Sequence, residues 1–164
     1  MAGVPWLILP TYEEAPNVEH VVARVLAALR PALGPGGFRV LVVDDASPDG
    51  TGAIADRLAA EHAELQVLHR TGPRGLAHAY LAGFRVALDG GASEVWEMDA
   101  DGSHDPADLP RLLGAVREGG AGLALGSRYV PGGDVAGWGV LRRVVSRGGS
   151  AYARLVLGVG VRDL

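Results

Sequence analysis

The sequence predicts an α/β fold in which a mostly parallel sheet is covered by helices on both faces. Two patterns carry this prediction: short apolar stretches alternate with longer segments whose apolar residues recur at helical spacing, and the connections between them are short. Composition is the third observation, because 48% of the 164 residues are hydrophobic and 21% are charged, as in a globular domain with a core.

The elements are expected in strict alternation. Short apolar runs, β-branched at residues 39–43, predict strands at residues 6–9, 39–43, 65–68, 95–98 and 122–125. Apolar residues at helical spacing predict helices at residues 18–29, 51–62, 76–88, 106–118 and 140–157. Pro16 and Asn17 are start signals for the first helix, the turn around Asp49 starts the second, and Asp105 before Pro106 is a cap for the fourth. With no repeat or linker, residues 1–164 are expected to form one domain.

Composition also excludes several classes of protein. There is no Cys, so a disulfide framework, a Cys zinc site and a Cys nucleophile are excluded. The first residues lack the basic segment of a signal peptide, and no stretch approaches the ~20 apolar residues of a membrane span. All 15 basic residues are Arg.

Charge is distributed unevenly along the chain. Residues 1–127 contain 9 Arg and 17 acidic residues, whereas residues 128–164 contain 6 Arg and 2 acidic residues. A basic C-terminal segment on an acidic protein predicts an anionic partner there: a phosphate, a membrane surface or a nucleic acid.

Polar and acidic residues follow the predicted strands. Ligands of parallel α/β sheets bind beyond the carboxyl ends of the strands, so these residues are expected along one edge. The acidic ones are Glu13, Glu14, Asp44, Asp45, Asp99 and Asp101. Unpaired carboxylates that close would repel one another, and the cluster therefore predicts a cation or hydrogen-bond donors between them.

Asp99 and Asp101 follow a buried strand and are two residues apart. Residues at this spacing in extended backbone point to the same side, so both carboxylates are expected to reach one Mg²⁺ or Mn²⁺. The alternative is a solvated turn. His104 is close enough in sequence to act as a ligand or a base.

Part of the segment "VVDDASPDGTG" can be explained by local structure without a binding role. A turn and a helix cap account for Ser47, Asp49 and Thr51. They do not account for Asp44 and Asp45, of which one is expected to accept hydrogen bonds from a nucleobase or ribose.

The C-terminal Arg residues suit phosphate recognition. Arg128 follows the last predicted strand, and Arg142 opens a helix whose apolar residues lie on one face and Arg143, Arg147 and Arg154 on another. Such a basic amphipathic helix could lie on an anionic membrane or pack on the sheet as an ordinary helix.

Five segments together resemble the family 2 glycosyltransferases with the GT-A fold, and in particular the polyprenyl- and dolichyl-phosphate mannosyltransferases. They are "LPTYEEAPN", "VVDDASPDGT", "RGLAHAYLAGF", "MDADGSHDP" and "LGSRYV", in the family's order and spacing. The resemblance implies an inverting enzyme that moves mannose from GDP-mannose to a polyprenyl phosphate with Mg²⁺ or Mn²⁺. It also implies a peripheral position at the cytoplasmic face of the membrane, directly or through a membrane-anchored partner domain, and no nucleic-acid partner.

Site residues carry over by position from this resemblance. The nucleotide-sugar site would comprise Pro10, Tyr12, Glu14, Val43, Asp45, Asp99, Ala100, Asp101 and Arg128. The metal would be held by Asp99 and Asp101, with Ser103 at the third-ligand position. The acceptor phosphate would meet Arg128, Arg142 and Arg147, and Asp101, Arg128 and Arg142 would be catalytic. Residues 130–164 would form the acceptor loop and a membrane-proximal helix.

Some features depart from the family pattern. Ala46 stands where Asn is usual, Ala77 stands where Gly is usual, and the chain ends at "VRDL" where the family continues into further helices, which implies a C-terminal truncation. Transfer from a UDP-sugar is the alternative within the family. A haloacid-dehalogenase-like phosphatase would use Asp99 as nucleophile, but it needs a Lys and places its motif on the first strand. A non-catalytic nucleotide-binding fragment is the remaining alternative.

Overall fold

The structure is a computed structural model that describes residues 3–127 and 140–158. The chain divides into two compact units, Met1–Leu113 and Gly114–Leu164, and each is described separately below. Helix α4, Leu109–Arg117, contains the boundary between them.

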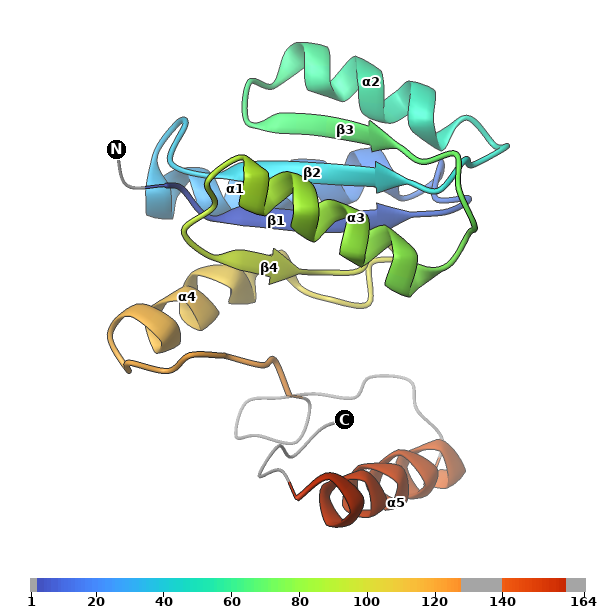
Figure 1. The fold of residues 1–164 in the computed structure, drawn as a ribbon, viewed down its shortest axis with the longest axis vertical. Helices are drawn as coiled ribbons and strands as arrows, with labels where there is room; N and C mark the ends of the chain where they lie inside the picture. Colours follow the sequence, from blue (N-terminus) through green and yellow to red (C-terminus); the bar gives the residue numbers. More distant parts are fainter. Residues whose placement is uncertain (1–2, 128–139, 159–164) are drawn as a thin grey trace. The chain divides into compact units, whose positions relative to one another are not determined.

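The first unit is built on a four-stranded parallel sheet in the order β3-β2-β1-β4 (Figure 1). Its strands are β1 Trp6–Thr11, β2 Arg39–Asp44, β3 Leu65–His69 and β4 Val95–Glu97. Thr11 of β1 is in register with Asp44 of β2, and Asp44 with His69 of β3. The polar ends of three strands therefore lie in one row, as the strand-end argument predicts.

Helices cover both faces of this sheet. They are α1 Val18–Leu33, α2 Thr51–Glu61 and α3 Leu76–Asp89. Alternate residues of β1 divide between two apolar clusters: Leu7 and Leu9 pack with α1 and α2, whereas Trp6 and Ile8 pack with α3. This alternation is the reason that residues 6–10 of β1 and 40–43 of β2 are all apolar.

Most predicted elements are confirmed with boundaries shifted by a few residues. Asp105 caps the turn Pro106–Asp108, a 3-10 helix, by accepting a hydrogen bond from the N–H of Ala107, and α4 follows. The predicted strand 122–125 is wrong: the segment has no regular secondary structure, and Leu123 and Leu125 are 72% and 50% exposed. A strand needs a hydrogen-bonded neighbour, and no described strand pairs with this glycine-rich segment.

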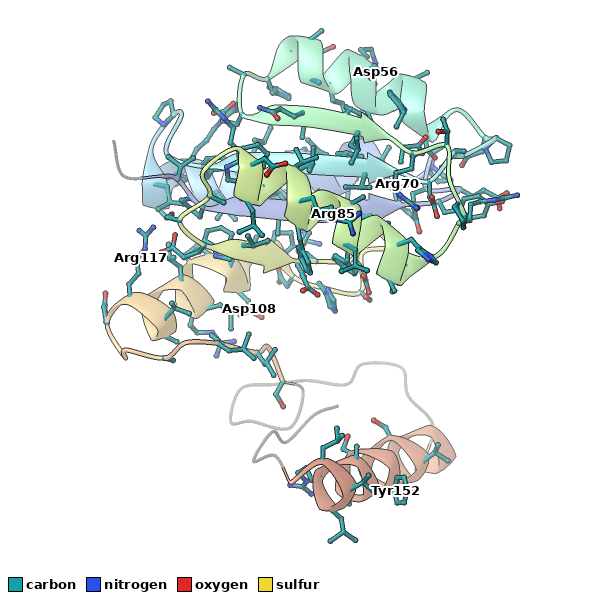
Figure 2. The ribbon with its side chains drawn as sticks, viewed as in Figure 1. Asp56, Arg70, Arg85, Asp108, Arg117 and Tyr152 are labelled. Atoms are coloured by element: carbon teal, nitrogen blue, oxygen red, sulfur yellow. The ribbon has the colours of Figure 1, made fainter. Side chains whose placement is uncertain are left out.

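Helix α5, Val140–Leu157, belongs to the second unit and has the predicted bounds. Among its described side chains, Val145, Tyr152, Leu155 and Val156 are 61–84% exposed, and Figure 2 shows Tyr152 projecting from the helix. No helix in the described ranges combines the length and the hydropathy that crossing a membrane requires.

Candidate active site

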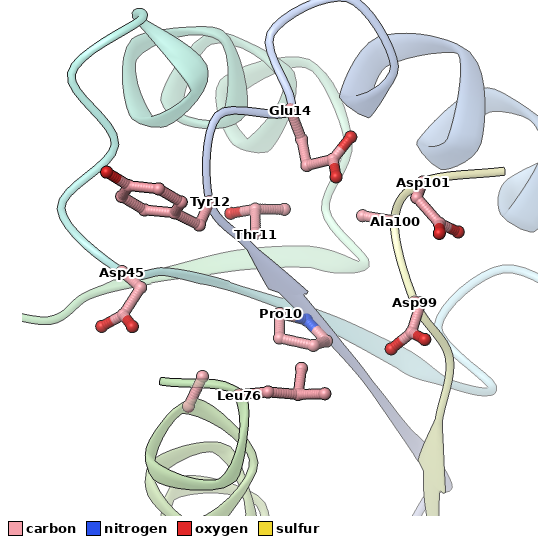
Figure 3. Close-up of a pocket in the computed structure, with 10 residues that line it drawn as sticks. Pro10, Thr11, Tyr12, Glu14, Asp45, Leu76, Asp99, Ala100 and Asp101 are labelled. Carbon is pink, nitrogen blue, oxygen red and sulfur yellow. The ribbon is translucent and has the colours of Figure 1, made fainter. Parts of the chain in front are cut away.

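A pocket of about 220 Å³ opens at the carboxyl ends of β1, β2 and β4 (Figure 3). It is lined by Pro10, Thr11, Tyr12, Glu14, Asp45, Leu76, Ala79, Asp99, Ala100 and Asp101. All of these residues belong to the first unit. In Figure 3, Tyr12 and Asp45 lie on one side of the end of β1, Asp99 and Asp101 lie on the other, and Glu14 lies between them.

The pocket brings together most of the residues predicted from the sequence to bind the nucleotide sugar. Seven of the nine residues expected to contact the nucleotide sugar line it. Val43 does not, because its side chain is fully buried in the cluster beneath α3. Arg128 lies outside the described residues, and Arg142 and Arg147 lie in α5 of the second unit, where their side chains are outside the description.

Three lining residues were not nominated: Thr11, Leu76 and Ala79. Leu76 and Ala79 come from the first turns of α3, which approaches the strand ends in space but not in sequence. Thr11 had a usable signal, because it lies inside the strand-end segment "LPTYEEAPN". Its hydroxyl is buried and has no hydrogen-bond partner in the described structure.

Asp45 is held between two donors. The Arg70 guanidinium donates to one carboxylate oxygen, and the backbone N–H of Gly75 donates to the other at 2.7 Å. Both side chains are largely buried, 11% exposed for Arg70 and 7% for Asp45. Arg70 also donates to the carbonyl of Pro73 at 2.9 Å, so Asp45 fixes the segment between β3 and α3 against the pocket.

The same segment reaches Tyr12. The guanidinium of Arg74 donates to the Tyr12 hydroxyl, and its central carbon lies 5.1 Å from the centre of the Tyr12 ring. This cation–π contact places a flat, positively charged group against the most exposed aromatic ring of the pocket.

Asp99 and Asp101 are placed differently from Asp45. The Tyr80 hydroxyl donates to Asp99 at 2.9 Å, and burial together with this hydrogen bond raises the pKa of Tyr80 well above its ordinary value, so the hydroxyl remains a donor. The backbone N–H of Ser103 donates to Asp101 at 2.8 Å. Hydrogen bonds from the Ser103 hydroxyl and N–H hold the pKa of Asp101 below its ordinary value, so that this carboxylate is ionised at neutral pH.

This part of the pocket fits a divalent metal ion. Neither Asp99 nor Asp101 forms an ion pair with any described cationic side chain, and both line the pocket. Within residues 3–127 and 140–158, no group of three or more acidic or His side chains could hold a metal alone. Such a site suits Mg²⁺ or Mn²⁺, which take a few carboxylates and complete their shell with water and substrate phosphates.

His104 contacts the backbone of the acidic segment through one ring nitrogen, Nδ1. Its ring nitrogen accepts a hydrogen bond from the backbone N–H of Asp99 at 3.2 Å, which closes the turn after β4. It does not line the pocket.

The pocket lies beyond the carboxyl ends of an open parallel sheet, the place where such sheets bind their ligands. The chain belongs to glycosyltransferase family 2, whose family model matches residues 6–162. Among solved structures, it is similar to a mannosyltransferase from Pyrobaculum calidifontis in complex with GDP-Man and Mn²⁺. That match has a TM-score of 0.56 and 30% identity, and covers 69% of this chain and 32% of the other.

Three characterised relatives extend the comparison. Over 96% of its length, the chain is 51% identical to the polyprenol monophosphomannose synthase of Mycolicibacterium smegmatis and 50% identical to the undecaprenyl-phosphate mannosyltransferase of Micrococcus luteus. The identity is 37% with the dolichol-phosphate mannosyltransferase of Pyrococcus furiosus. The chain spans 57%, 61% and 42% of the lengths of these relatives, respectively.

Proposed function

We propose that this chain carries the donor site of an inverting, metal-dependent transferase that moves mannose from GDP-mannose to a polyprenyl phosphate. Two observations together support the proposal. The chain is 50–51% identical to two polyprenyl-phosphate mannosyltransferases, and its pocket contains the carboxylates expected of a nucleotide-sugar site. They favour this function over a phosphatase or a scaffold.

The division of roles follows the geometry of the pocket. Tyr12, Glu14 and Asp45 would surround the nucleoside, and Asp99 and Asp101 would hold Mg²⁺ or Mn²⁺ with Ser103 nearby. Bound there, the metal would neutralise charge on the departing diphosphate as a Lewis acid. Hydrogen bonds from Ser103 keep Asp101 ionised, and the hydrogen bond from Tyr80 orients the Asp99 carboxylate. Both carboxylates would therefore be able to bind a cation without further rearrangement.

The acceptor side of the proposal rests on the C-terminal Arg residues. An acceptor phosphate is already ionised at neutral pH and needs no general base, so direct displacement with inversion requires only alignment and charge compensation. Arg128, Arg142 and Arg147 would supply that compensation, and Arg128 would also contact the donor. Asp101, Arg128 and Arg142 would be the residues in direct contact with the reacting groups.

We also propose peripheral binding at the cytoplasmic face of a membrane through residues 130–164, treated as part of one catalytic domain 1–164. Helix α5 has four Arg and no acidic residue, and it exposes Val145, Tyr152, Leu155 and Val156. Sedimentation with vesicles would test this: binding to anionic but not to neutral vesicles is expected, and no binding to either would refute it.

Ligand-dependent thermal stability tests the donor site. The protein would be melted with GDP, UDP or ADP, each with Mn²⁺, Mg²⁺ or EDTA. A nucleotide at 100 times its Kd adds about 2.7 kcal/mol, which is roughly 5–10 °C for a chain of this size. We expect the shift with GDP and metal; a shift with UDP alone would move the donor to a UDP-sugar, and no shift with any nucleotide would refute the proposal.

Two acidic substitutions make the test specific. Asp101→Ala should abolish the metal-dependent shift. Asp108→Ala removes the same charge from an exposed carboxylate that pairs with Arg111 outside the pocket, and it should leave the shift unchanged. Equal shifts in both variants would show that Asp101 does not hold the metal.

A further inference from the structure

The loop between β1 and α1 is held by side chains from the turn after β2. Three successive backbone N–H groups of this loop donate to three different side chains, 34 to 37 residues further along the chain. The bonds run from Glu13 to Ser47 Oγ at 3.1 Å, from Glu14 to Thr51 Oγ1 at 2.9 Å, and from Ala15 to Asp49 Oδ2 at 3.0 Å.

Two of these side chains also bind each other. The Thr51 hydroxyl donates to Asp49 Oδ1 at 2.6 Å while it accepts from Glu14, so it connects the carboxylate to the loop. The backbone N–H of Thr51 donates to the same oxygen at 3.1 Å. Thr51 is fully buried, and these hydrogen bonds, with that from Thr51 Oγ1 the largest contribution, lower the pKa of Asp49.

Helix capping does not account for this arrangement. The cap residue of α2 is Gly50, which has no side chain to offer. Ser47 and Thr51 accept from the loop, and Asp49 accepts from the Thr51 N–H through Oδ1 rather than through the Oδ2 that reaches the loop. Each facing loop also contains a non-glycine residue in the left-handed region, Glu13 at φ 59° and Ala46 at φ 57°. Such residues persist where surrounding bonds over-determine the backbone, and they concentrate at functional sites.

We infer that Ser47, Asp49 and Thr51 are positioning residues that hold Tyr12 and Glu14 in the conformation that binds the donor nucleotide. Tyr12 and Glu14 line the pocket, and the backbone of Glu14 is fixed directly by Thr51. Without this bond the loop would have to be ordered at each binding event, and nucleotide affinity would fall. The inference rests on the proposed nucleotide-sugar function.

A pair of substitutions at Thr51 tests it. Thr51→Val preserves the branched shape but leaves the Glu14 N–H without its acceptor, whereas Thr51→Ser keeps the hydroxyl. The control is Ile54→Val, which removes one methylene from a half-buried residue on the same helix whose side chain packs against the core cluster. GDP affinity in Mn²⁺ would be measured by calorimetry at 25 °C, and the Tm of each variant without ligand.

Thr51→Val should weaken GDP binding about tenfold, and Thr51→Ser should restore it. Ile54→Val should lower the Tm by a similar amount to Thr51→Val without changing the affinity, because stability alone does not alter binding to the folded protein. Unchanged affinity in Thr51→Val would overturn the inference, as would an equal loss of affinity in Ile54→Val.

Two further results keep the outcome decisive. If Thr51→Val does not fold, Asp49→Asn takes its place, because Asp49 is exposed. Both Asp49 oxygens accept hydrogen bonds, one from the Ala15 N–H and one from the Thr51 hydroxyl, so the amide nitrogen of Asn would face one of these donors and could not accept from it. It should also weaken GDP binding about tenfold, and unchanged affinity would overturn the inference. Failure of the unmodified chain to bind any nucleotide would instead reject the proposed function.

Discussion

Replacing Ala46 with Gly should stabilise this protein, although Gly usually destabilises where it replaces Ala. Ala46 is exposed and has a φ of 57°, in the left-handed region that an L-residue with a Cβ disfavours. It lies between Asp45, which lines the pocket, and Ser47, which holds the loop of Glu13. The Asn that is usual here in the family tolerates this φ better than Ala does.

The size of the effect follows from two opposing contributions. Removing the Cβ relieves about 1–2 kcal/mol of backbone strain. The greater freedom of Gly in the unfolded chain costs about 0.5–1 kcal/mol. The net gain is about 0–1.5 kcal/mol in the free energy of unfolding, or at most roughly 6 °C in Tm for a chain of 164 residues.

Thermal and urea unfolding of two variants would check this estimate. Ala46→Gly would be compared with Ala53→Gly, the same substitution at an exposed position of α2, where Gly costs about 1 kcal/mol. The two changes should therefore have opposite signs. If Ala46→Gly also destabilises, the left-handed conformation of Ala46 is not strained, and the argument that bonds from Ser47 and Asp49 impose it fails.

Two other perturbations have expected outcomes of different kinds. Tyr80→Phe removes the donor to Asp99 and should weaken Mn²⁺ binding to the GDP complex about tenfold, measured by metal titration. The control Tyr152→Phe, on the exposed face of α5, should leave Mn²⁺ affinity unchanged. Equal Mn²⁺ affinities of the two variants would show that Tyr80 does not support the metal site. Arg30→Ala leaves the buried Glu64 carboxylate without two hydrogen bonds of 3.0 Å and should cost about 1–2 kcal/mol of unfolding free energy at pH 7, a modest value because Arg30 is 41% exposed. The hydrogen bond from Arg30 lowers the pKa of Glu64 below its ordinary value, so this contribution is fully present above that ordinary value and is lost as the pH falls through the lower, folded-state pKa. Urea unfolding of the original chain and Arg30→Ala should therefore converge at acid pH, and a constant difference would show that the ion pair is not its source.

The sheet and its helices could be predicted because their patterns are local. A strand that is buried on both faces of a parallel sheet has a continuous apolar run in its middle, as at residues 6–9 of β1 and 40–43 of β2. The strand expected at 122–125 failed because apolar residues alone do not make a strand without a paired neighbour. The extra turn of α1 beyond residue 29 was missed because Pro31 suggests an earlier end, although a Pro near the end of a helix is accommodated here.

The pocket could be predicted only as far as strand ends reveal it. Pro10, Glu14 and Asp99 follow directly from the rule that parallel strands place their carboxyl ends at one edge. The hydrogen bond between Glu14 and Thr51 joins residues 37 positions apart, and no local pattern indicates it. Ser47, Asp49 and Thr51 were explained as a turn and a cap, which is sufficient locally but leaves out their long-range partners.

The acidic edge divides into two parts with different electrostatics, and this division determines where a metal belongs. Asp44 at the end of β2 and Asp45 just after it contact His69 at the end of β3 and Arg70 just after it, with Asp44 3.6 Å from the His69 ring. Asp99 and Asp101 after β4 receive only neutral donors within the described residues, so their charge is uncompensated. A divalent cation would gain most where no positive group already stands, and a metal bound at Asp45 would have to displace Arg70. In the proposed function this arrangement would separate the two tasks of a donor site, since the β2 side would bind an uncharged base and the β4 carboxylates would hold the cation that compensates the charge of a diphosphate.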